Sequence, residues 1–241
     1  MLQIERREQI LQLLSHTAAL RVTELAKMLY TSEATVRRDI TAMERAGLVH
    51  RVYGGVVKKR EEMPLDFRYQ ENAEGKRVMA QRAVALIGEG DSVFLDSSSS
   101  VQHMLPLIAR MPPLTVITNS HRVLEALSTT DHTLICTGGK LSKRNMAYVG
   151  QVAEATFTHL CPSIAFFSSQ GITAEGEVTD ASEEETALRR AVLKSTSRAV
   201  LLCGSEKLGK RFLHRLCHVS SLHAVITERE ETIEELLQNT P

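Results

Sequence analysis

The stretch from Thr31 to Gly47, TSEATVRRDITAMERAG, constrains the fold of this 241-residue chain more than any other. Ser32 suits the N-cap of a helix, because its hydroxyl can accept a hydrogen bond from the free amides of the first turn. Gly47 suits the left-handed residue that ends a helix. At about 100° per residue, one narrow face between these ends is apolar and predicts a buried side: Val36, Ile40 and Met43.

The opposite side of this helix carries small and cationic side chains: Ala34, Arg38, Thr41 and Arg45, with Arg37 on the flank. Such a face fits the groove of an anionic polymer. A run of charges is more often only a solvated surface, so the neighbouring segments must decide between the two interpretations.

A second helix and a tight turn precede this stretch. Four apolar residues recur at the spacing of one helix face, with Thr23 as the N-cap: Val22, Leu25, Ala26 and Leu29. Residues 30–32 leave only a tight turn before the next helix, which is the spacing of a helix-turn-helix. A third amphipathic helix begins near Ile4 and carries Ile10, Leu13 and Leu14. Downstream, residues 48–57 alternate around Gly54 and Gly55 as a hairpin does, so the sequence predicts a winged helix.

Particular segments here resemble the N-terminal domain of DeoR-type transcriptional regulators. They are Arg6, the LAKML segment, SEATVRRDI, and RAGLVHRVYGG followed by a basic tail. The resemblance implies that the winged helix binds double-stranded operator DNA.

The distribution of charge favours the same interpretation. Residues 1–60 hold 11 Lys and Arg against 6 Asp and Glu, a net of +5, whereas residues 61–241 hold 18 against 23, a net of −5. Because phosphate contacts release counterions, a basic domain is suited to DNA, and the acidic remainder argues against adhesion along the whole chain. We expect the DNA contacts among ten residues: Thr23, Ser32, Ala34, Thr35, Arg37, Arg38, Thr41, Arg45, Arg51 and Tyr53. For Tyr53 two roles stay open, contact with the sugar-phosphate backbone or packing on the hairpin core.

Composition excludes several other classes of protein. The chain is 43% hydrophobic, enough for conventional cores. It has no stretch near the ~20 apolar residues that cross a bilayer and no signal-like start, so we expect a cytoplasmic protein without membrane contact. Four scattered cysteines and nine histidines form no metal-binding or disulfide pattern, so no metal and no cofactor is expected.

The remainder of the chain alternates strands and helices. The charged run at 58–64, which ends in Pro64, suits an exposed connection. We therefore expect a winged helix at 1–58, a linker at 59–75, and an effector-sensing and oligomerisation domain at 76–241. Six apolar strands are predicted at 92–95, 114–118, 133–136, 163–167, 199–203 and 224–227, with helices near 76–87, 101–109, 122–128 and 184–195. This alternation predicts an α/β domain with a mainly parallel sheet covered by helices.

Small polar residues follow these strands. In such sheets ligands bind at the carboxyl ends of the strands, and hydroxyls with free amides at a helix N-terminus suit a phosphate. We expect an effector site built from Asp96, Ser97, Ser98, Ser99, Ser100, Thr118, Asn119, Ser120, Gly138, Gly139, Lys140, Gln170, Gly171 and Lys207.

These loops also resemble the C-terminal domain of the DeoR family, through LDSSSS, VITNS, TGGKL, YVG, the QGIT loop and SEKLG. The resemblance implies a fold similar to ribose-5-phosphate isomerase and a phosphorylated sugar or related metabolite as effector. Two departures stand out: a serine run replaces the glycine and threonines frequent in the family, and Gln170 stands where an acidic or other residue is common. The second departure leaves the identity of the sugar open.

Three functions compete. The leading one is a sequence-specific DNA-binding regulator, a repressor of a carbohydrate operon that a sugar phosphate releases. The alternative is an isomerase-like enzyme with an accessory DNA-binding domain, in which Asp96, Lys207 and the run 183–185 would supply acid-base groups. An architectural DNA protein is disfavoured by the elaborate acidic domain. We expect no catalytic residues, and we expect a homo-oligomer because one recognition helix reads only a few base pairs.

Overall fold

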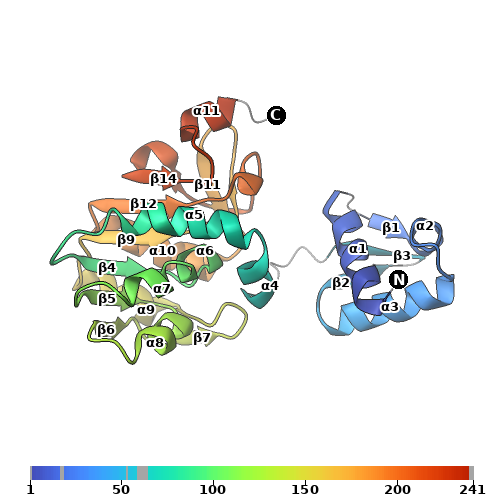
Figure 1. The fold of residues 1–241 in the computed structure, drawn as a ribbon, viewed down its shortest axis with the longest axis horizontal. Coiled ribbons are helices and arrows are strands. Elements are labelled where there is room, and N and C mark those ends of the chain that lie inside the picture. The colour runs from blue at the N-terminus through green and yellow to red at the C-terminus, as the bar shows by residue number, and fades with distance from the viewer. Residues whose placement is uncertain (1, 17–18, 53, 59–64, 239–241) are drawn as a thin grey trace. The chain divides into compact units, whose positions relative to one another are not determined.

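The computed structural model describes residues 2–16, 19–52, 54–58 and 65–238. The chain divides into two compact units, 1–63 and 64–241 (Figure 1). Each unit has its own hydrophobic core. None of the helices in the described ranges is both long and apolar enough to cross a membrane.

The first unit contains three helices and a three-stranded antiparallel sheet. Its helices are α1 (Gln3–His16), α2 (Val22–Met28) and α3 (Glu33–Arg45), and its strands are β1 (Ala19–Arg21), β2 (Val49–Val52) and β3 (Gly55–Lys58), in the order β1-β3-β2. The predicted winged helix-turn-helix is confirmed. Strand β1 was not predicted, because a three-residue strand has no periodicity and its partner β3 lies far along the chain.

The ends of α2 and α3 test the predicted helix caps. Ser32 caps α3 as expected, since its Oγ accepts from the Thr35 amide at 3.2 Å. Thr23 does not cap α2: the helix starts earlier, with Arg21 at the N-cap. The Glu24 carboxylate accepts from the Arg21 amide at 2.9 Å, so this end is satisfied without a serine or threonine hydroxyl.

A six-stranded parallel sheet forms the centre of the second unit. Its order is β14 (Ala224–Ile226), β12 (Arg198–Leu202), β9 (Ile164–Phe167), β4 (Ser92–Leu95), β5 (Thr115–Thr118) and β6 (Thr133–Cys136). All of these neighbours pair in parallel. The six strands are those that the sequence predicts, to within a residue at most ends.

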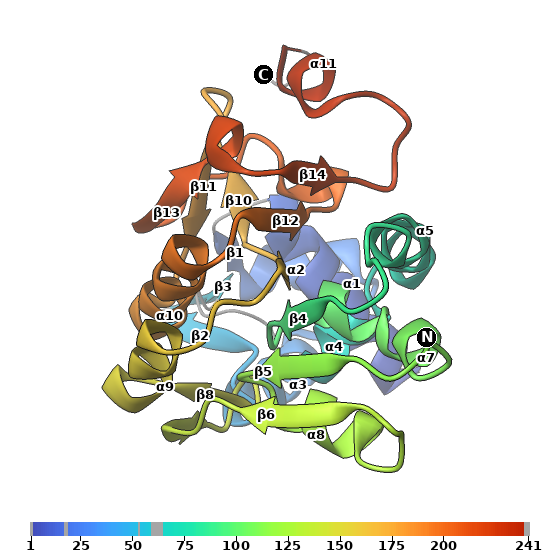
Figure 2. The same cartoon turned by 90° about the vertical axis from the view of Figure 1, so that its left-hand side faces the viewer.

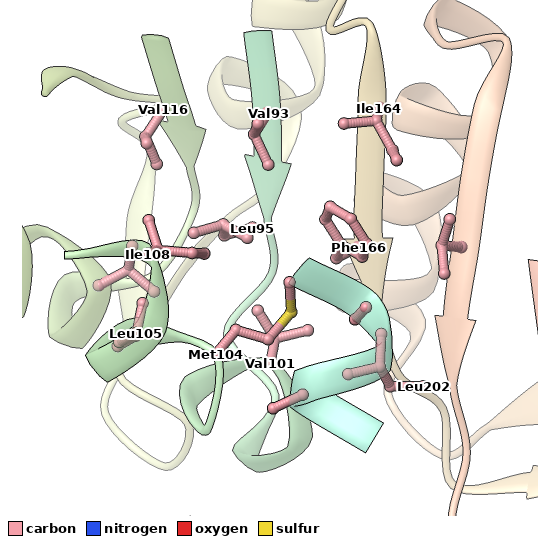
Figure 3. Packing of buried hydrophobic residues seen from close by; sticks show 14 of the residues in the cluster. Val93, Leu95, Val101, Met104, Leu105, Ile108, Val116, Ile164, Phe166 and Leu202 are labelled. Atoms are coloured by element: carbon pink, nitrogen blue, oxygen red, sulfur yellow. The ribbon is translucent and has the colours of Figure 1, made fainter. Parts of the chain in front are cut away.

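Helices cover both faces of this sheet. Because side chains alternate along a strand, Val93 and Leu95 enter one core while Phe94 enters the other. The first core, shown in Figure 3, joins the strands to α5 (Ala73–Val84), α6 (Ser99–Gln102), α7 (Leu105–Ile108) and α8 (His121–Leu127). The second lies under α9 (Gln151–Ala155) and α10 (Glu183–Ser195), on the other side of the strands in Figure 2.

Two expectations about helices need correction. The helix expected near 101–109 is two short helices, α6 and α7, joined by i to i−3 bonds such as Met104 N–H to Val101 O at 2.9 Å, and Pro106 lies in the first turn of α7. The expected linker also extends too far, because α4 (Leu65–Gln70) belongs to the second unit, with Leu65 buried. Residues 59–64 lie outside the described residues.

Smaller elements complete the second unit. Strands β7 (Lys140–Ser142) and β8 (Ala147–Val149) form a hairpin. Strands β10 (Gly171–Ile172), β11 (Glu177–Asp180) and β13 (His214–His218) form an antiparallel sheet, and α11 is Ile233–Gln238. None of these elements was predicted, because each is too short to show a periodic pattern.

Candidate functional site

The exposed face of α3 is the first candidate site. Val36, Ile40 and Met43 are at most 1% exposed, as predicted. The residues expected to contact DNA lie on the other side, where Ala34, Arg37, Arg38 and Arg45 are exposed and Thr35 and Thr41 are half-buried. Thr23 and Ser32 are exposed at the starts of α2 and α3.

A buried carboxylate that the sequence analysis missed fixes α3 against α1. Asp39 is 1% exposed, and it accepts from Nε of Arg6 at 2.6 Å and Nε of Arg7 at 3.3 Å. Its position three residues after Val36, within the apolar stripe, was the available signal. These pairs hold the helix so that its other face points outward.

Strand β2, the first strand of the hairpin, adds a cation beside α3. The Arg51 amide donates to Glu44 at 3.1 Å, and its guanidinium donates to the Thr41 hydroxyl at 3.3 Å. Arg37 pairs with Glu33 on the surface at 3.3 Å, an exchangeable pair that contributes little to stability. Four guanidinium groups therefore share this side of the unit, at positions 37, 38, 45 and 51. Tyr53 lies outside the described residues.

The second candidate site lies at the carboxyl edge of the parallel sheet. From β4 the chain proceeds to β5 and β6 on one side, and then to β9, β12 and β14 on the other. The connections therefore change direction between β4 and β9. In open α/β sheets, ligands bind at this switch point.

Asp96, the first residue after β4, joins the two halves of the sheet there. Its side chain is 1% exposed and accepts from the Ser98 amide at 2.8 Å, the Ser168 amide at 3.1 Å and Nε of Arg189 at 3.1 Å. Three donors occupy this carboxylate. It therefore shapes the two loops and is not free to act as a base.

Unpaired polar atoms gather around this carboxylate. Within the residues that the structure describes, five buried side-chain atoms have no hydrogen-bond partner: Ser97 Oγ, Ser100 Oγ, Asn119 Oδ1, Ser169 Oγ and Gln170 Nε2. All five follow the carboxyl ends of β4, β5 or β9. Because buried polar groups are nearly always paired, such a concentration marks a candidate site at which a polar ligand or ordered water supplies the partners.

Two lysines approach the same edge. Lys207 donates to the Ser168 hydroxyl at 2.8 Å, and that hydroxyl donates to Leu202 O at 2.7 Å. Lys76 on α5 is 4% exposed, and its ammonium donates to the Arg68 and Glu71 carbonyl oxygens. Burial, with Lys207 as a second cause, lowers the pKa of Lys76 from 10.5 to about 8. The sequence does not single out Lys76, since one lysine in a helix carries no signal.

Other expected effector residues have structural roles. The Ser98 and Ser120 hydroxyls cap α6 and α8, accepting at 3.3 Å from Val101 and Val123, and the Thr118 hydroxyl donates to Leu95 O at 2.6 Å. The Ser99 carbonyl pairs with His103 Nδ1 at 2.8 Å. Because α6 has only four residues, its dipole gives little support to the expected phosphate site.

The remaining expected residues shape neighbouring turns. Gly138 and Gly139 have φ of 66° and 105°, and a Cβ on Gly139 would lie 2.7 Å from Val149 O. A Cβ on Gly171 would overlap the Lys210 carbonyl. Lys140 is exposed and pairs with Glu184 at 2.6 Å, so it does not join the unpaired atoms.

A buried ionic network, also missed, lies behind the site. Arg189 bonds to Asp96 at 3.1 Å, Asp180 at 3.0 Å and Glu185 at 3.2 Å. Asn145 donates to Glu185 and accepts from Arg68 of α4 at 2.6 Å.

Next to Arg68, Tyr69 stacks on His103 with ring centroids 4.2 Å apart. Burial is the main cause that lowers the pKa of His103, so this ring is neutral at neutral pH. These contacts hold α4 beside the serine loop.

Over the described part of the chain, no three His, Cys, Asp or Glu side chains are grouped so that they could hold a metal ion. The chemistry of the sheet edge is that of hydroxyl, amide and ammonium groups, which suits an oxygen-rich anion.

Family models match both units. Residues 6–62 match the DeoR-like helix-turn-helix domain, and residues 71–229 match the DeoR C terminal sensor domain. The chain belongs to the DeoR family. It is thus a DNA-binding transcriptional regulator with a sensor domain, and the enzyme alternative is not supported.

Characterised relatives resemble this DeoR-family regulator over nearly its whole length. The L-fucose operon activator of Haemophilus influenzae is 32% identical, over 93% of this chain and 91% of its own. The lactose phosphotransferase system repressor of Streptococcus mutans is 30% identical over 94% and 92%, and the regulator GlpR of Haloferax volcanii is 29% identical over 95% and 91%.

Solved structures are similar in fold alone. The eIF2B beta structure from Chaetomium thermophilum has a TM-score of 0.50 and 15% identity, and it covers 69% of this chain, which spans only 52% of that protein. A ribose-5-phosphate isomerase from Methanocaldococcus jannaschii has a TM-score of 0.43 and 14% identity, over 57% and 55% of the two chains.

Proposed function

We propose that this regulator is a sequence-specific repressor of a carbohydrate-metabolism operon, and that a phosphorylated sugar or related metabolite releases it from its operator. The observation that carries the effector part is the set of five unpaired polar atoms at the switch point. The names of two relatives, a lactose phosphotransferase system repressor and an L-fucose operon activator, support a sugar operon as the target.

The donors and acceptors at this edge match such an effector. Three serine hydroxyls and the Gln170 amide can donate to phosphate or hydroxyl oxygens, and Asn119 Oδ1 can accept from a sugar hydroxyl. Lys207 lies within 2.8 Å of the Ser168 hydroxyl in the same loop region and supplies positive charge. A sugar phosphate offers both kinds of partner, so it would pair groups that are otherwise buried and unpaired.

On the DNA side, the exposed cations of α3 and Arg51 suit contacts to phosphates and base edges. One such helix reads only a few base pairs. We therefore propose that the regulator binds as a homo-oligomer, with two recognition helices on half-sites about one helical turn apart.

Release requires that the effector bind the two states of the protein unequally, because a ligand of equal affinity shifts no equilibrium. We propose that the sugar phosphate favours the arrangement that cannot place two recognition helices on one operator. Ligand binding and DNA binding are then reciprocally antagonistic.

Fluorescence anisotropy with labelled DNA from upstream of the neighbouring operon tests this proposal. Sugar phosphates are titrated into the complex, with the matching free sugars and inorganic phosphate as controls. We expect one sugar phosphate to lower operator affinity while its free sugar does not. A candidate that raises the melting temperature, and so binds, yet leaves operator affinity unchanged would contradict the repressor model. Ser97→Ala, which removes one of the unpaired hydroxyls from this loop, should reduce the ligand effect with DNA binding retained.

A further inference from the structure

Helix α2 ends in a hydrogen-bonded motif that places Tyr30 in a left-handed conformation. The Thr31 amide donates to Ala26 O at 3.0 Å and the Tyr30 amide to Lys27 O at 3.3 Å. This pair of bonds is the Schellman motif, whose left-handed position glycine usually occupies. Tyr30 has φ of 49°.

Helix α3 ends in the same motif and serves as an internal comparison. The Leu48 amide donates to Met43 O and the Gly47 amide to Glu44 O, both at 2.9 Å. Here the left-handed residue is Gly47, with φ of 73°. The unit therefore ends two helices with the same motif, α3 with glycine at the left-handed position and α2 with tyrosine.

The tyrosine carries a conformational cost that glycine avoids. In the left-handed region the Cβ of an L-residue crowds the following carbonyl. Asn and Asp reduce this cost by bonding locally, whereas a tyrosine side chain has no such option. Tyr30 is therefore a backbone outlier of the kind that concentrates at functional sites.

Nothing in the described part of the first unit compensates for this cost. The Tyr30 side chain is 97% exposed, and its hydroxyl has no hydrogen bond to any described residue. The ring neither packs on the core nor shields it. A reason for a tyrosine at this place must therefore lie in something that binds to the unit.

The position of the residue identifies that partner. Tyr30 lies in the turn of the helix-turn-helix, two residues before Ser32, the N-cap of the recognition helix. When such a helix enters the major groove with its first residues, the preceding helix crosses the DNA backbone, so the turn that joins the two helices lies between groove and backbone. We propose that Tyr30 contacts the DNA backbone, donating its phenolic hydroxyl to a phosphate oxygen.

Two substitutions test this contact on the full-length protein. Tyr30→Phe removes only the hydroxyl, and Tyr30→Gly removes the side chain while restoring the residue that the motif prefers. Both should weaken binding to a labelled duplex of arbitrary sequence at low salt by about two- to tenfold, the effect of one lost hydrogen bond. The dependence of affinity on salt should stay unchanged, because a neutral phenol releases no counterion.

Melting temperatures separate this role from a folding defect. Tyr30→Gly should melt no lower than the wild type, whereas the matched change Gly47→Ala should melt lower, since it adds a Cβ at the other left-handed position. Leu213→Ala, which alters a residue 85% exposed in the second unit, should leave DNA affinity unchanged. Wild-type DNA affinity in both Tyr30 variants would overturn the proposal. Loss of affinity in Tyr30→Gly alone would also overturn it, because the phenolic hydroxyl would then make no contact with DNA. Arg38→Ala in the same assay reports separately on DNA binding by α3.

Discussion

Serine-to-alanine changes around β4 and β9 should stabilise the protein while weakening its response to effector. Ser97, Ser100 and Ser169 each bury a hydroxyl that has no partner among the described residues. A buried polar group without a hydrogen bond costs about 1–3 kcal/mol, and alanine removes it while leaving little empty space. We therefore expect each variant to gain about 1 kcal/mol, or roughly 2–4 °C in melting temperature for a domain of this size.

Ser98 gives a control within the same loop. Its hydroxyl accepts from the Val101 amide at 3.3 Å and caps α6, so Ser98→Ala should lose about 0.5–2 kcal/mol. Neighbouring serines, changed in the same way, should thus shift stability in opposite directions. No argument from composition or exposure alone predicts that difference.

Calorimetry of the full chain with and without a sugar phosphate measures both effects. A saturating effector at 100 times its dissociation constant stabilises the wild type by ~2.7 kcal/mol. Without ligand, each of the three serine-to-alanine variants should melt at a higher temperature than the wild type. Each should need about fivefold more ligand for the same rise in melting temperature. If all three melt below the wild type, as Ser98→Ala should, their hydroxyls are paired and the location of the effector site is wrong.

Three further predictions concern single residues. If Arg38 contacts a base, Arg38→Ala should weaken operator binding by roughly 1–3 kcal/mol and relax the base preference at that position. If Arg38 contacts a phosphate, the substitution should lower the slope of affinity against salt by about one. Unchanged affinity, salt slope and base preference would remove Arg38 from the interface. Asp96→Asn should destabilise the second unit by about 3 kcal/mol in denaturant titrations, since Arg189 and two amides lose a buried carboxylate; a loss below about 1 kcal/mol would contradict its anchoring role. The folded-state pKa of Lys76 is lowered to about 8, so the unfolded chain holds more protons than the folded chain between pH 8 and 10.5. The stability of the wild type relative to Lys76→Met should therefore rise with pH across that window. A difference in stability that stays constant with pH would refute the shift.

Local patterns were sufficient for the six core strands, which are apolar runs, and for α3, which carries its own cap and apolar stripe. The site was harder to predict. The serines at 97–100 look alike in the sequence, yet one caps a helix, two have unpaired hydroxyls, and one offers its carbonyl to His103. Those roles depend on the direction of the backbone after β4, which no periodicity specifies.

Long-range pairs were out of reach for the same reason. Arg189 meets Asp96 across 93 positions, and Arg68 meets Asn145 across 77. Helix α4 has only six residues, too few to show a helical period, and contacts from distant segments hold it in place.

The pairing of β4 with β9 has a consequence for the order in which the regulator becomes competent. Strands β4, β5 and β6 are consecutive along the chain and can associate early. The Asp96 carboxylate, however, is satisfied in part by the Ser168 amide, 72 residues later. The winged helix is synthesised first, before the loop that completes the sensor exists. During synthesis there is therefore a period in which the DNA-binding unit can be folded while the chain cannot yet respond to its effector.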